Sequence, residues 1–374
     1  MPFGNLMRTV ALSLGLAVAA ANGLAAQSRT GTARQPAPGD DVYRIANRGA
    51  AFLELGVGAR ALALGGAYVA LAEGATALYW NPAGIADVPG IAASLSYETL
   101  YDDSGLTNSF AAFAVPVGAG AAGLAVTYFS SGKIERTTER YPEGGDPTAG
   151  QYVEWSGLAI GASYARQITD RLSLGGTLKF AQEGISFARA TYFGGDFGVR
   201  FRTGLYGITL GAALTNLGSR GRMEGPAVDR TLTPGDDPRL PTQRDIPIQL
   251  RPDAVLMPAA IRFGVRTELL GTPYSVFGSG NPEHKLTMLA EMVDAINAPT
   301  LPMVAFEYGF RNLFFVRGSK LFRGAAEAEN DFTSGLAGGF GVRVPGLGRT
   351  LAIDYAYRSV ELGSNQSISI EFGF

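Results

Sequence analysis

The carboxyl-terminal stretch of the chain, QSISIEFGF, alternates apolar and polar side chains without interruption. Its apolar positions are Ile368, Ile370, Phe372 and Phe374. Successive side chains of a β-strand point to opposite faces, so this spacing predicts a strand with one apolar and one polar face. The same alternation recurs upstream, for example in residues 303–310. The repeated pattern favours an all-β fold built from two-faced strands.

Continuing along the chain, the alternation predicts about 14 strands. Most are about ten residues or longer, whereas strands in soluble proteins average about 5–6 residues. Ten residues tilted by about 45° is the length that crosses a bilayer. The predicted strands are 91–100, 107–117, 120–134, 151–167, 171–184, 190–203, 205–217, 257–270, 283–295, 301–310, 312–323, 332–345, 349–360 and 365–374.

The connections between these strands differ in length in a regular way. They are short at 118–119 and 168–170, and long at 135–150 and 218–256. Outer-membrane barrels have tight periplasmic turns and long outer loops, so the pattern predicts such a barrel, although 271–282 is long for a periplasmic turn. The alternative is a large soluble β-sandwich, whose strands also alternate. Strand length and loop asymmetry favour the closed transmembrane barrel.

Composition excludes several classes of protein. The chain has no cysteine, which excludes a lipoprotein anchor, disulfides and thiolate metal sites. The single histidine, His284, excludes a zinc site with several histidine ligands, and a hydrolase triad would depend on it alone. A net charge of −2 gives no indication of the basic surface that nucleic-acid-binding proteins use. We therefore predict no metal, no cofactor, no nucleic-acid partner and no enzymatic activity.

The chain divides into four predicted parts. Residues 1–26 resemble a signal peptide, because Arg8 precedes an apolar run of about a dozen residues and then small residues. A short membrane anchor is the alternative, but the run is too short to span a bilayer. Residues 27–40 are predicted to be flexible, 41–90 to form a hatch, and 91–374 to form the barrel.

The predicted hatch is apolar but has no strand pattern. Irregular backbone cannot face lipid, so we expect this segment to lie in the barrel lumen, as in plugged barrels. Its glycines permit close approach and unusual φ values, and Asn-Pro signals a turn towards the first strand. The motif positions are Gly65, Gly66, Tyr79, Trp80, Asn81, Pro82, Ala83 and Gly84.

Residues 56–86, GVGARALALGGAYVALAEGATALYWNPAGIA, resemble the amino-terminal signature of the PorV/PorQ family of outer-membrane proteins. They are more distantly similar to FadL-type transporters of hydrophobic compounds. The resemblance implies a 14-stranded barrel with an amino-terminal hatch. It also implies a role beside the type IX secretion machinery, with secretion components and exported clients as partners. The alternative is a passive channel for hydrophobic small molecules. In either role, outer-membrane lipids and the barrel-assembly machinery would be further partners.

Charged residues on the polar faces of the strands are expected to line the lumen. They form either a hydrated, ion-paired interior or a selectivity surface for an anionic or amphipathic ligand. The polar segment 220–258 is either a disordered outer loop or a docking surface. The predicted lumen-facing charges are Lys179, Arg200, Arg202, Arg262, Arg266, Glu268, Glu307, Arg343, Asp354 and Arg358.

The terminal strand yields a prediction about assembly. Phe372 and Phe374 occupy the position of the carboxyl-terminal assembly signal of outer-membrane barrels. Deleting residues 372–374 should abolish folded barrel in the membrane, measured as loss of heat-modifiable migration in mild detergent. Normal assembly of the truncated chain would contradict the predicted topology.

Overall fold

The computed structural model describes residues 48–102, 104–137, 141–145, 152–185, 187–232, 246–278, 281–296, 299–322, 335–346 and 349–373. The predicted signal peptide, the predicted flexible segment, the first residues of the predicted hatch and Phe374 lie outside these ranges. Within the described residues, no helix is both long enough and apolar enough to span a membrane.

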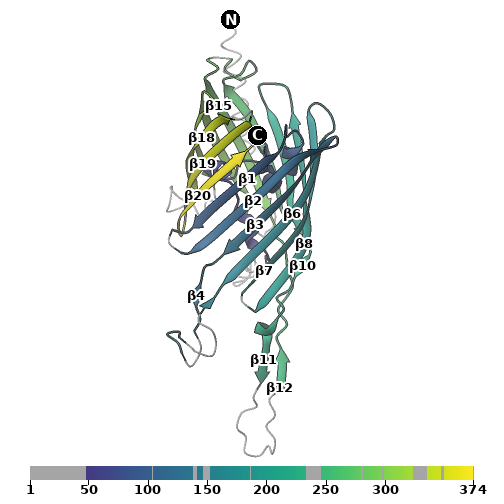
Figure 1. The fold of residues 1–374 in the computed structure, drawn as a ribbon, viewed down its shortest axis with the longest axis vertical. Helices are drawn as coiled ribbons and strands as arrows, with labels where there is room; N and C mark the ends of the chain where they lie inside the picture. The colour runs from purple at the N-terminus through teal and green to yellow at the C-terminus, as the bar shows by residue number, and fades with distance from the viewer. Residues whose placement is uncertain are drawn as a thin grey trace, which may run out of the picture. The chain divides into compact units, whose positions relative to one another are not determined.

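Fourteen antiparallel strands close into a barrel, which confirms the fold predicted from the alternation (Figure 1). Neighbours in sequence are neighbours in the sheet throughout. The barrel strands are β1 (Ala92–Leu100), β2 (Leu106–Val117), β3 (Gly120–Ser130), β6 (Trp155–Gln167), β7 (Leu172–Ile185), β8 (Ala188–Arg202), β9 (Thr209–Gly218), β14 (Ala260–Leu270), β15 (His284–Ala295), β16 (Leu301–Phe310), β17 (Phe314–Leu321), β18 (Leu336–Gly346), β19 (Arg349–Val360) and β20 (Gly363–Phe372).

The predicted strand bounds agree closely with these. Two predictions, 301–310 and 349–360, coincide with β16 and β19. The starts of β9 and β18 and the two bounds between β3 and β6 each differ from the prediction by four residues, and between β3 and β6 the alternation continues past the barrel. There the chain forms a separate two-stranded ladder, β4 (Ile134–Glu135) with β5 (Tyr152–Val153), so β3 ends before and β6 begins after the predicted bounds.

Closure of the barrel depends on the pairing of its first and last strands. Ala93 of β1 lies opposite Phe372 of β20, and the register continues to Thr99 opposite Gln366. This pairing provides hydrogen-bond partners for the backbone N–H and C=O groups that would be unpaired at the two edges of an open sheet. In lipid each such group would cost several kcal/mol.

The two faces of the strands differ as the alternation requires. Large apolar side chains such as Phe263 and Phe306 point outwards and are 48% and 45% exposed. Inward positions carry small or polar side chains, many of them buried; Ser369 and Glu371 are examples. The outer surface thus matches the hydrocarbon of a bilayer, with the polar positions enclosed.

The connection between β9 and β14 carries structure of its own. It contains β10 (Arg220–Gly221), η3 (Pro226–Val228), β11 (Asp229–Leu232), β12 (Ile246–Gln249) and β13 (Val255–Leu256). β10 pairs with β13, and β11 pairs with β12, both antiparallel. The described part of this connection is therefore a pair of β-ladders, which differs from the disordered loop considered from its composition.

Residues 48–91, the described part of the chain before β1, form no barrel strand. They contain four short helical elements: η1 (Ala51–Glu54), α3 (Ala59–Ala63), α4 (Ala77–Trp80) and η2 (Pro82–Ile85). Nearly all of their residues are buried, although none of the elements exceeds five residues. Helices this short are not stable alone, so packing against the barrel wall must hold them in place.

The outward orientation of Phe263 can be tested by substitution. Phe263→Arg places a cation in hydrocarbon and should destabilise the barrel by about 2–4 kcal/mol near the bilayer midplane. Phe263→Leu keeps the apolar face and serves as the matched control. The measurement is the urea midpoint for unfolding in liposomes; equal midpoints for the two variants would contradict the assigned face.

Candidate functional site: the buried segment and the inner wall

Residues 49–88, here called the inner segment, pass along the inside of the barrel from one end to the other. At the end with the long β9–β14 connection, the Gly49 amide donates to Leu256 O (2.8 Å) and the Ala50 amide to Glu183 Oε1 (2.7 Å). At the end with the short turns, Arg200 and Arg202 of β8 contact Asp87. The segment therefore lies inside the barrel from one end to the other and then enters β1.

Glycines on the wall make room for the inner segment. A Cβ added at Gly157 would lie 2.5 Å from the Phe52 ring, and one at Gly264 would lie 2.5 Å from Val69 Cγ1. Such distances are shorter than real carbon contacts, so a larger residue would displace the segment. Glycine, at 51 residues, is about twice its typical share of a chain. The close contacts between the wall and the inner segment explain part of the high glycine content.

The Asn-Pro-Ala-Gly motif is anchored to the wall by the Asn81 side chain. Its Oδ1 accepts from the Ala83 amide (3.1 Å) and caps η2. Its Nδ2 donates to Val69 O (2.8 Å) within the segment and to Val199 O (3.0 Å) on β8. Gly84 packs so close to Ala72 O that an added Cβ would lie 2.4 Å away.

The remaining motif residues hold the segment together internally. Gly65 and Gly66 have φ of 66° and 87°, which favour glycine over any residue with a Cβ. Tyr79 Oη donates to Leu53 O (2.6 Å), and Trp80 Nε1 donates to Val57 O (3.0 Å). Both rings are buried or nearly so, and they pack edge to face at 5.1 Å.

Backbone groups of the segment also use polar side chains of the wall. The Ala59 amide donates to Ser369 Oγ (3.1 Å), and the Val69 amide donates to Glu291 Oε2 (2.8 Å). Asn108 Nδ2 donates to Gly56 O (3.0 Å), and Ser319 Oγ donates to Ala63 O (3.0 Å). The polar side chains of the inner wall therefore provide hydrogen-bond partners for the irregular backbone of the inner segment.

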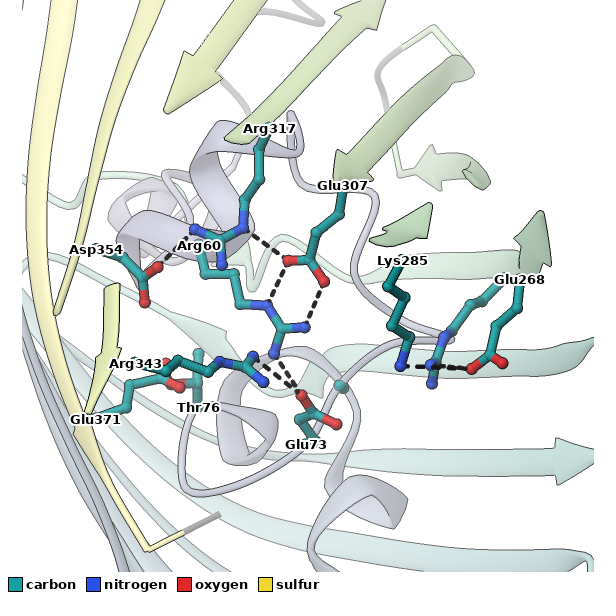
Figure 2. A network of polar contacts seen from close by, with 12 residues as sticks. Arg60, Glu73, Thr76, Glu268, Lys285, Glu307, Arg317, Arg343, Asp354 and Glu371 are labelled. Carbon is teal, nitrogen blue, oxygen red and sulfur yellow. Dashed lines mark hydrogen bonds and ion pairs between the residues drawn. The ribbon is translucent and has the colours of Figure 1, made fainter. Parts of the chain in front are cut away.

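A buried ion-pair network joins the segment to β16, β17 and β19 (Figure 2). The guanidinium of Arg60, on α3, binds Glu307 through two bonds of 2.8 Å. Arg317 binds the same Glu307 (2.7 Å) and also Asp354 (2.5 Å). Arg60 further contacts Glu73, so one arginine connects the wall with a second turn of the segment. Removing one member of such a group would leave buried charge unpaired.

Glu73 lies in the inner segment, outside the strands. Burial alone would raise its pKa, but Arg60, Arg343 and Arg266 together lower the pKa to about 2. The carboxylate is therefore ionised throughout the physiological range. The contact between Arg60 and Glu73 should not change between pH 5 and pH 8.

The other predicted lumen charges all find partners on the inner side. Arg262 lies 4.8 Å from the Trp80 ring and 3.0 Å from Glu291, which places it directly against the segment. The others form pairs at several places on the inner wall, and the structure does not gather all ten into one site, although Arg200, Arg202, Arg266 and Arg343 line one cavity at the short-turn end. These pairs are Lys179 with Asp196, Arg266 with Glu268, Arg343 with Glu73, and Arg358 with Glu98.

Sequence reasoning missed several members of these networks. Arg317 and Glu291 occupy inward positions of predicted strands, so the alternation alone could have identified them. Arg60 and Glu73 carry a different signal, because a charged side chain in a segment that must be buried needs a partner. The identity of the partners follows only from the barrel register and the path of the segment.

The polar groups do not assemble a metal centre in the part of the chain that the structure describes. No group of three or more histidine or acidic side chains there could hold a metal ion. His284, the only histidine, contacts Tyr308 Oη through Nδ1 at 2.6 Å. The pair belongs to the start of β15 and to β16, away from the inner segment.

Comparison with known proteins gives similarity in structure alone. No family model and no curated protein sequence matches the chain. The toluene transporter TodX of Pseudomonas putida is similar with a TM-score of 0.52 and 14% identity, over 85% of this chain and 96% of TodX. A FadL homologue of Pseudomonas aeruginosa gives 0.48 and 12%, over 84% and 97%. The monoaromatic hydrocarbon channel CymD gives 0.48 and 13%, over 85% and 96%.

The closed barrel, its apolar outer face and the fold that it shares with TodX define the class of the protein. The chain is a β-barrel of the bacterial outer membrane. The expected relation to the PorV/PorQ family stays a resemblance carried by residues 56–86. Because tight turns face the periplasm in outer-membrane barrels, we expect the Asp87 end of the barrel on that side.

The close fit of the motif can be tested at Gly198 on β8. A Cβ there would lie 2.1 Å from Asn81 Oδ1 and 2.8 Å from Pro82. Gly198→Ala should therefore destabilise the protein by about 1–3 kcal/mol through overpacking. In Gly318→Ala, the added methyl group meets nothing within 4 Å, so this variant is the control. Equal urea midpoints for the two variants would show that the segment does not press on the wall.

Proposed function

We propose that this outer-membrane barrel is a passive channel for small hydrophobic molecules, and that passage requires the inner segment to shift. The proposal rests mainly on one observation: an apolar segment lies in the lumen of this barrel. The segment contributes Leu64, Tyr68, Leu71, Leu78 and Trp80 to one buried cluster. Such a lumen is unsuited to a steady water-filled pore.

The lipid-facing wall offers a second supporting feature. A shallow apolar depression of about 390 Å³ lies over β1, β2, β3 and β20. The register explains it: outward Ser109 lies between Tyr97 and Tyr128, and outward Ala111 lies between Leu95 and Val126. Two small side chains between rows of large ones leave a trough that an apolar molecule can occupy.

The neighbours are consistent with this proposal, since TodX is described as a toluene transporter and has the same fold. A role beside type IX secretion remains the second candidate, and it depends on the resemblance of residues 56–86 to PorV/PorQ proteins. A genome encoding both type IX components and proteins with the matching sorting domain would favour that role. The structural comparisons support the channel more than the secretion role.

The proposed movement can be tested with a reversible cross-link. Thr76 Oγ1 of the segment lies 2.9 Å from Ser94 Oγ of β1, and the chain has no cysteine of its own. The double variant Thr76→Cys/Ser94→Cys should therefore form one disulfide that ties the segment to the wall. Each single variant cannot form this bond and is a matched control.

The measurement is uptake of a labelled monoaromatic hydrocarbon by cells with an intact lipopolysaccharide leaflet and no channel of their own for such compounds. The native protein should raise uptake above the empty vector. The cross-linked variant should fall to the vector rate, and a reductant should restore uptake. Native uptake equal to the vector rate would refute the channel, and undiminished uptake by the cross-linked variant would refute the required movement.

A further inference from the structure

The short-turn end of the barrel holds a cavity of about 470 Å³ between the inner segment and the wall. Its charged lining is strongly unbalanced. Five arginines face two carboxylates, Glu73 and Asp87, which leaves an excess of three positive charges in the lining. The arginines come from β8, β14, β18 and the turn after β16: Arg200, Arg202, Arg266, Arg343 and Arg311.

Each of the two carboxylates contacts more than one arginine, and Asp87 has two arginines of the lining to neutralise. Asp87 contacts both Arg200 and Arg202. Glu73 contacts Arg60 and also lies 3.8 Å from Arg343. Arg60 has Glu307 as its principal partner, so Glu73 is left to Arg343, whereas Asp87 serves two guanidinium groups and one of those positive charges has no carboxylate of its own.

The other two arginines of the lining have their own acids just outside it. Arg266 contacts Glu268 at 2.8 Å, a carboxylate that Lys285 also approaches at 3.7 Å, and Arg311 contacts Glu283 at 2.9 Å. Even so, the buried Nε atoms of Arg200 and Arg266 have no hydrogen-bond partner among the described residues. The cavity therefore combines uncompensated charge with unused donors.

We infer that this cavity binds a compact polyanion that carries phosphate or carboxylate groups. The planar guanidinium group matches such oxyanions with paired N–H donors, and several arginines around one cavity favour more than one anionic group per ligand. Because the site lies at the short-turn end, the ligand would enter from the periplasm. The inference does not require the hydrophobic route proposed above, because the anion would bind with the inner segment in its present position.

A soluble anion fits better than a lipid headgroup. Arg200 and Arg266 occupy inward strand positions, beside Gly198 and Gly264 that touch the inner segment. The apolar outer face of the barrel therefore separates the cavity from the bilayer. A headgroup would have to leave the membrane plane and enter the barrel mouth.

Binding of pyrophosphate to the purified protein in neutral detergent, measured by calorimetry, tests the inference. The native protein should bind with a dissociation constant below about 1 mM, and binding should weaken as salt is added. The informative variant is Arg202→Gln/Arg343→Gln. It leaves Asp87 with Arg200 and Glu73 with Arg60, so neither acid loses its last arginine.

This variant should bind pyrophosphate at least about tenfold more weakly, because it loses two charge-assisted contacts. The control is Arg166→Gln, which removes one positive charge at the same end of the barrel from an exposed, outward position of β6. Its affinity should stay within about twofold of the native value. Heat-modifiable migration of both variants verifies that they are folded.

Three outcomes would overturn the inference. Absence of binding to the native protein at about 10 mM pyrophosphate would exclude the site. An equal loss in Arg166→Gln would show that only general charge attracts the anion. Displacement of pyrophosphate by phosphatidylglycerol added to the micelles would assign the cavity to a lipid headgroup and not to a soluble anion.

Discussion

Backbone hydrogen bonding in a medium without water is the constraint on which the rest of this structure depends. Each N–H and C=O group that faces lipid needs a partner within the protein, and only a closed sheet provides one for every strand. Here closure is made by β1 and β20, with Ala93 opposite Phe372. Once that register is set, alternation sends every second side chain into the lumen. The identity of those inward side chains then decides what the barrel can contain.

The inner segment and the wall fit each other because the wall is built from small and polar residues where the two meet. Gly157, Gly198 and Gly264 leave room that any Cβ would fill. Ser369 and Glu291 supply acceptors to backbone amides that would otherwise be buried without partners. A segment with four short helical elements can persist in this environment because the barrel provides both the packing and the hydrogen bonds that the segment lacks by itself.

Charge inside the barrel serves two different purposes at two depths. In the middle, Arg60, Glu307, Arg317 and Asp354 form closely bonded pairs that tie the segment to three strands. At the periplasmic end the acids are too few for the arginines around them, and a cavity remains. The paired region gives the barrel interior a defined arrangement, whereas the unbalanced region is where we propose that an anion binds. The apolar depression over β1, β2, β3 and β20 and the arginine-lined cavity involve separate parts of the wall, so the two proposed roles do not compete for the same residues.

The sequence by itself determined the strands, their faces and the closed barrel. Alternation with a period of two residues can be recognised within one segment, and a strand of about ten such residues has the length that crosses a bilayer. It also indicated that residues near Asn81 form a turn and that charges such as Glu307 point inwards. Only the tertiary structure decided that Arg60 reaches Glu307, or that Arg200 and Arg202 share Asp87. These contacts join positions more than a hundred residues apart, and their geometry follows from the barrel register and from the path of the inner segment, neither of which a local pattern encodes.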